Sequence, residues 1–417
     1  MQWLMGAKLT LCLFLFSLSA WGFDIDKKAT SLSEALNAMM ARHPVLLSKQ
    51  SQVESKGYLL ESAKAERYPT ASLSYGEATD REQEGSFVLK QPLWAFGRID
   101  AGIDYASTDI EVEKLDQLRL TRELMQETAS AYLKVLGIQK KLYIVAENIQ
   151  QHEVFLEQIQ RRTAGRLASE TDTRLAASRL TQTRVQAIQM EGELRDALTE
   201  LRTYTLLPIE SVKPVDTLQL LITEDEGLIR DRVLKQSAGV QHKEQLVDLA
   251  VKDVQRKRSN YMPTIYLKMS HEYSDNATYP DETRFSLVFE GSLEGMGFIT
   301  RYKEKSAFSQ LHAAERDVEV TQFDLENRLN TLLLNRATQV SLIEIHQESI
   351  DQLDETLQSY LRQYKSGRKE WLDVLNIQRE ITEQKLAQAQ ARNNIELSTM
   401  ELVALMGSLD ALLDVRY

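Results

Sequence analysis

The sequence predicts an α+β fold, mainly α, in which long helical hairpins are combined with four short β-strands. All seven prolines lie at or before position 280, and 93–207 and 281–417 contain none, so uninterrupted helix is permitted over long tracts. Four short stretches alternate apolar and polar residues, the pattern of half-buried strands. Similar motifs also recur about two hundred positions apart, which indicates two copies of one unit.

The N-terminus has the pattern of a secretory signal. Lys8 is the only charge before Asp24, and the apolar run LTLCLFLFSLSA is followed by a small-x-small sequence at Ala20-Trp21-Gly22. A membrane anchor is the alternative, but about 12 apolar residues are fewer than the roughly 20 that a spanning helix needs. The sequence therefore predicts a signal peptide over residues 1–22.

Composition argues against several classes of function. The chain has 50 basic and 61 acidic residues, a net charge of −11, and no basic patch interleaved with aromatic residues, so we expect no nucleic-acid partner. Its only cysteine, Cys12, lies within the predicted signal and leaves no thiol for catalysis or metal binding. The six histidines lack HExxH spacing, and neither a P-loop nor a GxSxG motif is present. We therefore expect no enzyme activity and no cofactor.

Three pairs of motifs define the internal repeat. ERYPTASLSY resembles NYMPTIYLKM, QPLWAFGRI matches GSLEGMGFI at a leucine and a glycine, and DTRLAASRL parallels DVLNIQREI, all in the same order. Between the copies, LLPIESVKPVDTLQLLITEDE contains two prolines and reads as a connector. The predicted units are a first helix-strand-strand-helix repeat at 23–205, a connector at 206–225 and a second repeat at 226–417.

The predicted strands lie at about 69–78, 84–92, 263–273 and 283–291. In the first, Leu73 and Tyr75 alternate with Ser72 and Ser74. A hairpin half-buried on a soluble core is one interpretation, but strands of about 10 residues also cross a bilayer when tilted. For an exported chain the membrane barrel is favoured. Because the smallest known barrels need about eight strands, four strands have to be completed by other chains.

The helical tracts have narrow apolar stripes. Leu329, Ile343, Ile350, Leu357 and Tyr364 follow one line at heptad spacing, which Arg336 interrupts. Such a narrow stripe is typical of a helix that meets water on more than one side, so we expect a wall rather than a compact core. From about 299 to 365 this helix would be on the order of 100 Å long.

Each helical tract is interrupted once by a glycine motif. TAGRLASETDTRL and YKSGRKEWLDVL predict hairpin tips at about 163–172 and 364–373. We expect Gly165 and Gly367 each to adopt the left-handed conformation that ends one helix before the next begins.

Together these features resemble the TolC family of outer-membrane channel-tunnels. The resemblance rests on the signal, the LSEAL start (Leu32–Leu36) with His43-Pro44, the YPTASLSY and MPTIYLKM strand entries, QPLWAFGR, the paired tips and the repeat. It implies a homotrimer in the cell outer membrane, with a twelve-stranded β-barrel in lipid and a periplasmic α-barrel tunnel. It further implies a periplasmic adaptor (membrane fusion) protein and an inner-membrane ABC transporter or other pump as partners.

The resemblance also implies roles for tip residues. The implied periplasmic gate contains Asp172, Tyr364, Lys369, Asp373 and Asn376, and the implied hairpin-tip turns and adaptor contacts are Gly165, Arg166, Gly367 and Arg368. Lys369 stands where the family has arginine and lacks its two-pronged donor geometry. Asn376 stands where a second acidic residue can occur. Gly165 and Asp172 are seven apart but Gly367 and Asp373 six, which leaves the first-tip match open to a one-residue shift.

Simpler roles remain open for the same residues. Asp172 follows Ser169 by three and can complete a capping box, and Asp373 can act similarly in the first turn of its helix. Tyr364 continues the apolar stripe and can serve packing alone, while Lys369 can be a solvated charge.

Three functions remain as interpretations. We favour a passive conduit for type I protein secretion, for example of large adhesins. The alternatives are the outer-membrane component of a drug or metal efflux pump and, from another class, a periplasmic coiled-coil adaptor.

Overall fold

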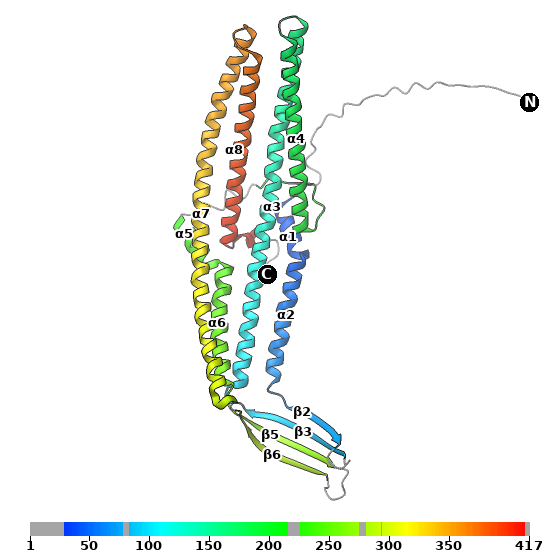
Figure 1. Cartoon of the computed structure of the whole chain (residues 1–417), viewed down its shortest axis with the longest axis vertical. Helices are drawn as coiled ribbons and strands as arrows, with labels where there is room; N and C mark the ends of the chain where they lie inside the picture. The colour runs from blue at the N-terminus through cyan, green and yellow to red at the C-terminus, as the bar shows by residue number, and fades with distance from the viewer. Residues whose placement is uncertain (1–28, 78–82, 216–225, 275–280, 293, 413–417) are drawn as a thin grey trace, which may run out of the picture.

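The computed structural model describes residues 29–77, 83–215, 226–274, 281–292 and 294–412. The predicted signal peptide and residues 216–225 of the predicted connector lie outside this part. The described chain is long and narrow, with a β-sheet at one end and two helical hairpin tips at the other (Figure 1).

Eight α-helices make up most of the described chain. No described helix is both long and apolar enough to cross a membrane. Each repeat begins with two helices rather than the single one predicted. In the first repeat His43 is extended (φ −66°, ψ 121°) ahead of Pro44, which starts the second helix at a position that suits proline. In the second repeat Ser237 is extended (φ −62°, ψ 114°) and caps the second helix. The helices are α1 (Leu32–Arg42), α2 (Pro44–Ala65), α3 (Arg98–Ala164), α4 (Glu170–Thr205), α5 (Glu226–Gln236), α6 (Ala238–Ser259), α7 (Phe298–Lys365) and α8 (Trp371–Leu405).

The two longest helices, α3 and α7, run from the sheet to the tips (Figure 1). They contain 67 and 68 residues, which corresponds to about 100 Å each at 1.5 Å per residue. In the half near the sheet the packing order across the wall is α2-α3-α6-α7, and in the half near the tips it is α4-α3-α8-α7. Helix α7 therefore forms one border of the wall in both halves, with α5 packed against it near mid-length, while α2 and α4 form the other.

The sheet has four antiparallel strands in the order β2-β3-β5-β6. The central β3–β5 pair joins the two repeats, with Leu89 opposite Met269. The first and last strands are edges without a partner strand in the described chain. The strand bounds are β2 (Thr70–Glu77), β3 (Gln83–Trp94), β5 (Thr264–Ser274) and β6 (Glu282–Glu290).

Strand register sorts the side chains onto two faces, because directly opposed residues share a face. Leu267 lies opposite Leu287, and both are exposed, Leu287 by 71%. The other face is mostly polar. The apolar face contains Ala71, Leu73, Tyr75, Phe87, Leu89, Ile265, Leu267, Met269, Phe285, Leu287 and Phe289, whereas the opposite face contains Ser72, Ser74, Ser86, Lys90, Lys268 and Ser286. The predicted alternation is therefore present across the whole sheet.

The largest hydrophobic core lies near mid-length, where α1 and α5 pack beside the long helices (Figure 1). A short parallel pair, β1 (Ala29–Thr30) with β4 (Ser211–Val212), also lies there. The fully buried Tyr132 places its hydroxyl 2.9 Å from the Thr30 carbonyl and 2.7 Å from that of Lys213. Burial raises the pKa of Tyr132 to about 12, so this hydroxyl stays protonated and links the two segments to α3.

Helix α3 joins the two hairpins by packing against α8 as well as α4. This contact includes buried amides: the Gln378 amide nitrogen donates to Asn148 at 3.1 Å. At Gly137 the helices approach so closely that an added Cβ would lie 2.4 Å from Oδ1 of Asn393. A side chain at position 137 therefore conflicts with the packing of α8.

We expect Gly137→Leu to lower the free energy of unfolding by about 1–3 kcal/mol, because the larger side chain overpacks the α3–α8 contact. Thermal unfolding of the detergent-solubilised protein measures this loss. Gly102→Leu near the start of α3 is the matched control, because no atom lies within 4 Å of a Cβ added there and leucine favours helix more than glycine does. Equal stability of the two variants would contradict the proposed packing, whereas adding Asn393→Ala to Gly137→Leu should recover part of the loss.

Candidate functional site

The two hairpin tips are built by the same backbone turn. In the first, between α3 and α4, the N–H of Leu167 donates to the Arg162 carbonyl at 2.8 Å and that of Arg166 to Thr163 at 3.0 Å. This pair of bonds is a Schellman motif, which satisfies the last carbonyls of a helix.

The second tip, between α7 and α8, repeats this pattern. The N–H of Arg368 donates to Gln363 at 2.9 Å and that of Gly367 to Tyr364 at 3.1 Å. The positions that form the turn are therefore Arg166 in the first tip and Gly367 in the second.

The left-handed residue differs between the tips. Gly367 has φ +73° as expected, but Gly165 has φ −80°, and Arg166 takes the left-handed conformation with φ +57°. The expectation for Gly165 is wrong, because the turn requires a positive φ one residue later. An arginine there costs roughly 1–2 kcal/mol relative to a favourable backbone conformation.

Pairing Arg166 with Gly367 also resolves the spacing of the acidic residues. Asp172 is then equivalent to Asp373, since each lies six positions after the left-handed residue of its tip. The difference between the two glycine-to-aspartate spacings, seven residues in the first tip and six in the second, arises because Gly165 is not the left-handed residue.

Both aspartates act at helix starts. The Asp172 N–H donates to Oγ of Ser169 at 3.0 Å, and Asp172 Oδ2 accepts from the Ser169 N–H at 3.2 Å, which completes a capping box. Asp373 Oδ2 accepts from the Glu370 N–H at 3.4 Å and lies 3.5 Å from Nζ of Lys369. Both carboxylates therefore have the helix-capping role that the sequence left open for them.

Tyr364 connects the second tip with the first. Its ring lies 5.0 Å from that of Trp371, and the guanidinium of Arg162 lies over it at 5.0 Å. Burial, with a smaller contribution from the Asp172 carboxylate, raises the pKa of Tyr364. The tyrosine thus lies where α3 and α7 end and α4 and α8 begin.

Sequence reasoning did not identify Trp371, the largest fully buried side chain among the residues that the structure describes. It is the first residue of α8, is 2% exposed, and meets Phe155 of α3 edge-to-face at 5.4 Å. A large aromatic residue directly after an exposed glycine turn was the available signal. We name the surrounding group the tip cluster: Phe155, Ile159, Ala176, Leu357, Trp371, Val374, Leu375 and Ile381.

The remaining predicted residues lie around this cluster. The ammonium of Lys369 is 4.3 Å from the Tyr360 ring, and Asn376 is half-buried one helical turn beyond Asp373. Gly165, Arg166, Gly367 and Arg368 are exposed at the ends of the hairpins.

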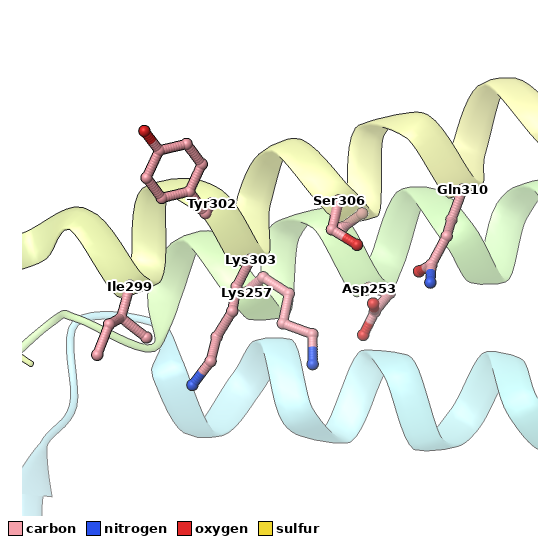
Figure 2. Close-up of a pocket in the computed structure, with 8 residues that line it drawn as sticks. Asp253, Lys257, Ile299, Tyr302, Lys303, Ser306 and Gln310 are labelled. Atoms are coloured by element: carbon pink, nitrogen blue, oxygen red, sulfur yellow. The ribbon is translucent and has the colours of Figure 1, made fainter.

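An open groove between α6 and α7 lies near the sheet, far from the tips. Lys257 and Lys303 extend beside one another in it, while Tyr302 points away (Figure 2). It also contains Asp253, Ile299, Ser306, Ala307 and Gln310. Among the residues that the structure describes, no group of three His, Cys, Asp or Glu side chains is placed to bind a metal ion.

Comparison with known proteins gives matches in sequence and in structure. Residues 35–205 and 229–408 match the model of the outer membrane efflux protein family. The proteases secretion protein PrtF of Dickeya chrysanthemi is 26% identical over 295 residues, which cover 66% of this chain and 63% of that protein, less than two thirds of its length.

Two solved structures share the fold at low sequence identity. The outer membrane protein VceC of Vibrio cholerae has a TM-score of 0.76 and 14% identity, covering 90% of this chain and 96% of its own. The CmeC outer membrane channel of Campylobacter jejuni has a TM-score of 0.74 and 13% identity, covering 97% and 93%.

The family model covers most of the chain in two segments, each of which includes one hairpin and one strand pair. The mainly helical architecture agrees with both solved structures. The chain therefore belongs to the outer membrane efflux protein family, the TolC-like outer-membrane channels with a periplasmic helical tunnel.

Proposed function

We propose that three copies of this chain form a passive conduit across the outer membrane. The observation that carries this proposal is the four-stranded sheet with two open edges and one exposed apolar face. In lipid an open edge would leave backbone groups without hydrogen-bond partners, so the β6 edge of one copy needs the β2 edge of the next. Three sheets of four strands then give the twelve-stranded barrel of the family.

The helical wall supports the same head-to-tail closure. Its borders are α7 on one side and α2 and α4 on the other, and these borders expose large apolar side chains. Contacts between two different surfaces of neighbouring copies produce a closed ring when the rotation from one copy to the next is a whole fraction of a full turn. The exposed side chains are Phe323, Leu334 and Ile345 on α7, Tyr58 and Leu59 on α2, and Val185 and Ile188 on α4.

The tips form the periplasmic entrance in this assembly. The tip cluster holds the α7/α8 hairpin against the α3/α4 hairpin, and Asp373 of three copies would surround a narrow opening. The conduit opens by realignment of the helices when an adaptor contacts the tips, including Gly165, Arg166, Gly367 and Arg368. Energy comes from the inner-membrane transporter.

Single-channel conductance in a planar lipid bilayer tests this function. We expect the purified trimer to form a pore with a preference for cations, because a carboxylate ring attracts them. Asp373→Asn should reduce that preference, whereas Asp317→Asn on the shaft of α7 should change it less. A protein that forms no pore would overturn the proposed function, and unchanged ion preference in Asp373→Asn would overturn the ring alone.

Protein secretion is the cargo class we favour over drug or metal efflux. Its support is the relative named for protease secretion, together with the resemblance of the PLWAFGR stretch to the protein-export branch of the family. A gene deletion distinguishes the two classes. Loss of a large protein from the culture medium supports secretion, while increased sensitivity to drugs or metals with unchanged secreted proteins supports efflux.

A further inference from the structure

Two lysines lie directly opposite one another on the polar face of the sheet. Lys90 of β3 is the register partner of Lys268 of β5, and Thr70 and Ser286 continue the same row into β2 and β6. We name these four residues the lysine row. Like charges directly opposite one another destabilise an antiparallel strand pair. The stability of the sheet therefore does not explain why both positions are lysine.

Acidic neighbours compensate the lysine row only in part. The ammonium of Lys90 lies 2.9 Å from Oε2 of Glu290 and 5.7 Å from the centroid of the Tyr266 ring. Lys268 is half-buried and forms no ion pair with any residue that the structure describes. One positive charge per chain is therefore left over in this row.

Charges of opposite sign are separated along the strands. Toward the end of the sheet that is far from the helices, Glu272 lies opposite Glu282, whose carboxylate is 2.6 Å from the guanidinium of Arg284 (Figure 1). Glu272 is four residues from Lys268 along β5, a distance of about 13 Å at 3.3 Å per residue. Charges more than about 10 Å apart are largely screened at 0.1 M salt, so this carboxylate does not neutralise Lys268.

The proposed function places the lysine row inside the barrel. The apolar face of the sheet meets lipid in that assembly, so the polar face lines the lumen, and three copies contribute six lysines. The low-dielectric wall of a pore concentrates the field of fixed charges. Rings of lysine or arginine side chains are one basis of anion selectivity in pores.

We infer that Lys90 and Lys268 are specificity-determining residues of the conduit, which make the lumen of the barrel favour anions. This inference rests on the proposed function and deepens it, because the conduit then has two charge-selective elements in series. Asp373 favours cations at the tips, and the lysine row favours anions in the sheet at the opposite end of the molecule (Figure 1). Lys268 makes the larger contribution, since Glu290 offsets the charge of Lys90.

The tips are the narrower opening in the proposed assembly. The preference of the resting pore for small ions therefore follows the tip carboxylates, and the lysine row does not reverse it. Its effect becomes measurable in two ways, by removing the tip carboxylates and by presenting a multivalent anion from the side of the sheet.

Reversal potentials in planar bilayers under a KCl gradient give the first measurement. Lys268→Gln is introduced into the Asp373→Asn trimer, where the barrel has more weight. We expect it to lower the chloride-to-potassium permeability ratio about twofold or more, because three lumen charges are lost. The change should shrink as salt rises. Lys268→Arg keeps the charge and should keep the ratio.

Block by inorganic triphosphate gives the second measurement. From the side of the sheet this anion reaches the lysine row without passing the tips, so it should reduce the conductance of the wild-type trimer at lower concentration than from the tip side. Lys268→Gln should raise the half-blocking concentration about threefold or more. The matched control is Lys235→Gln, which removes an equal charge from an exposed position in α5, near mid-length and away from the sheet.

The gel mobility of unheated samples shows that each variant is a trimer before its conductance is compared. A conducting trimer in which Lys268→Gln has the ion preference and the triphosphate block of Lys235→Gln would overturn the inference and leave the proposed function intact. Equal block of the wild type from both sides would also overturn it. A chain that forms no pore would overturn both, so the two failures are distinguishable.

Discussion

Leu287→Arg is expected to abolish stable insertion of the trimer into the outer membrane, whereas Ser286→Arg is expected to be tolerated. Leu287 lies mid-strand in β6 on the apolar face and is 71% exposed, while Ser286 lies on the polar face beside Lys268. An arginine on the lipid face costs about 2–4 kcal/mol near the bilayer midplane, and the trimer would carry three.

Two measurements show the outcome: cell fractionation, and the gel mobility of unheated compared with heated samples, which reports the trimer. We expect Ser286→Arg to appear as a trimer in the outer-membrane fraction, with altered ion preference because its side chain would face the lumen of the proposed barrel. Leu287→Arg should be missing from that fraction. Equal insertion of the two variants would contradict the assignment of the faces, and a reversed result would place the polar face toward lipid.

Trp371→Ala should open the tip. Removing a fully buried aromatic side chain costs about 3–5 kcal/mol through lost packing and the cavity left behind. The loss falls on the contact of Trp371 with Tyr364 in its own hairpin and on its contact with Phe155 of α3, which joins the two hairpins. We therefore expect larger resting conductance in planar bilayers and faster tryptic cleavage at Arg166 and Arg368.

Trp371→Phe is the control for this prediction. It keeps an aromatic ring against Phe155 and should conduct nearly as the wild type does. Because the largest core lies at mid-length, far from the tips, the Trp371→Ala trimer should still assemble. An intact trimer with unchanged conductance would show that the tip cluster does not hold the entrance closed.

The sequence predicted the long helices and the strands well because both depend on local patterns. The absence of proline permits helices α3 and α7, and strict alternation such as that of Leu73 and Tyr75 marks strands with distinct faces. The extra helix break in the first repeat has a local cause, since Pro44 separates α1 from α2, whereas α5 and α6 of the second repeat are separated at Ser237 without a proline.

The tips were harder to predict, because the hydrogen bonds of a turn, and not the residue type, determine which position takes the left-handed conformation. The sequence places Gly165 in the motif, but the hydrogen bonds of the Schellman turn require the positive φ at Arg166. The contacts of Trp371 with Phe155 join residues more than two hundred positions apart, and Gly137 meets Asn393 over a similar separation. Periodicity along one helix contains no information about such partners.

The placement of α7 at one border of the wall has a genetic consequence. In the proposed ring every subunit contact uses α7 of one copy against α2 and α4 of the next, so one defective copy interrupts closure. If wild-type and α7-border variants are expressed equally and mix freely, only about one-eighth of rings contain three intact copies. Alleles that damage this border without preventing folding should therefore be dominant.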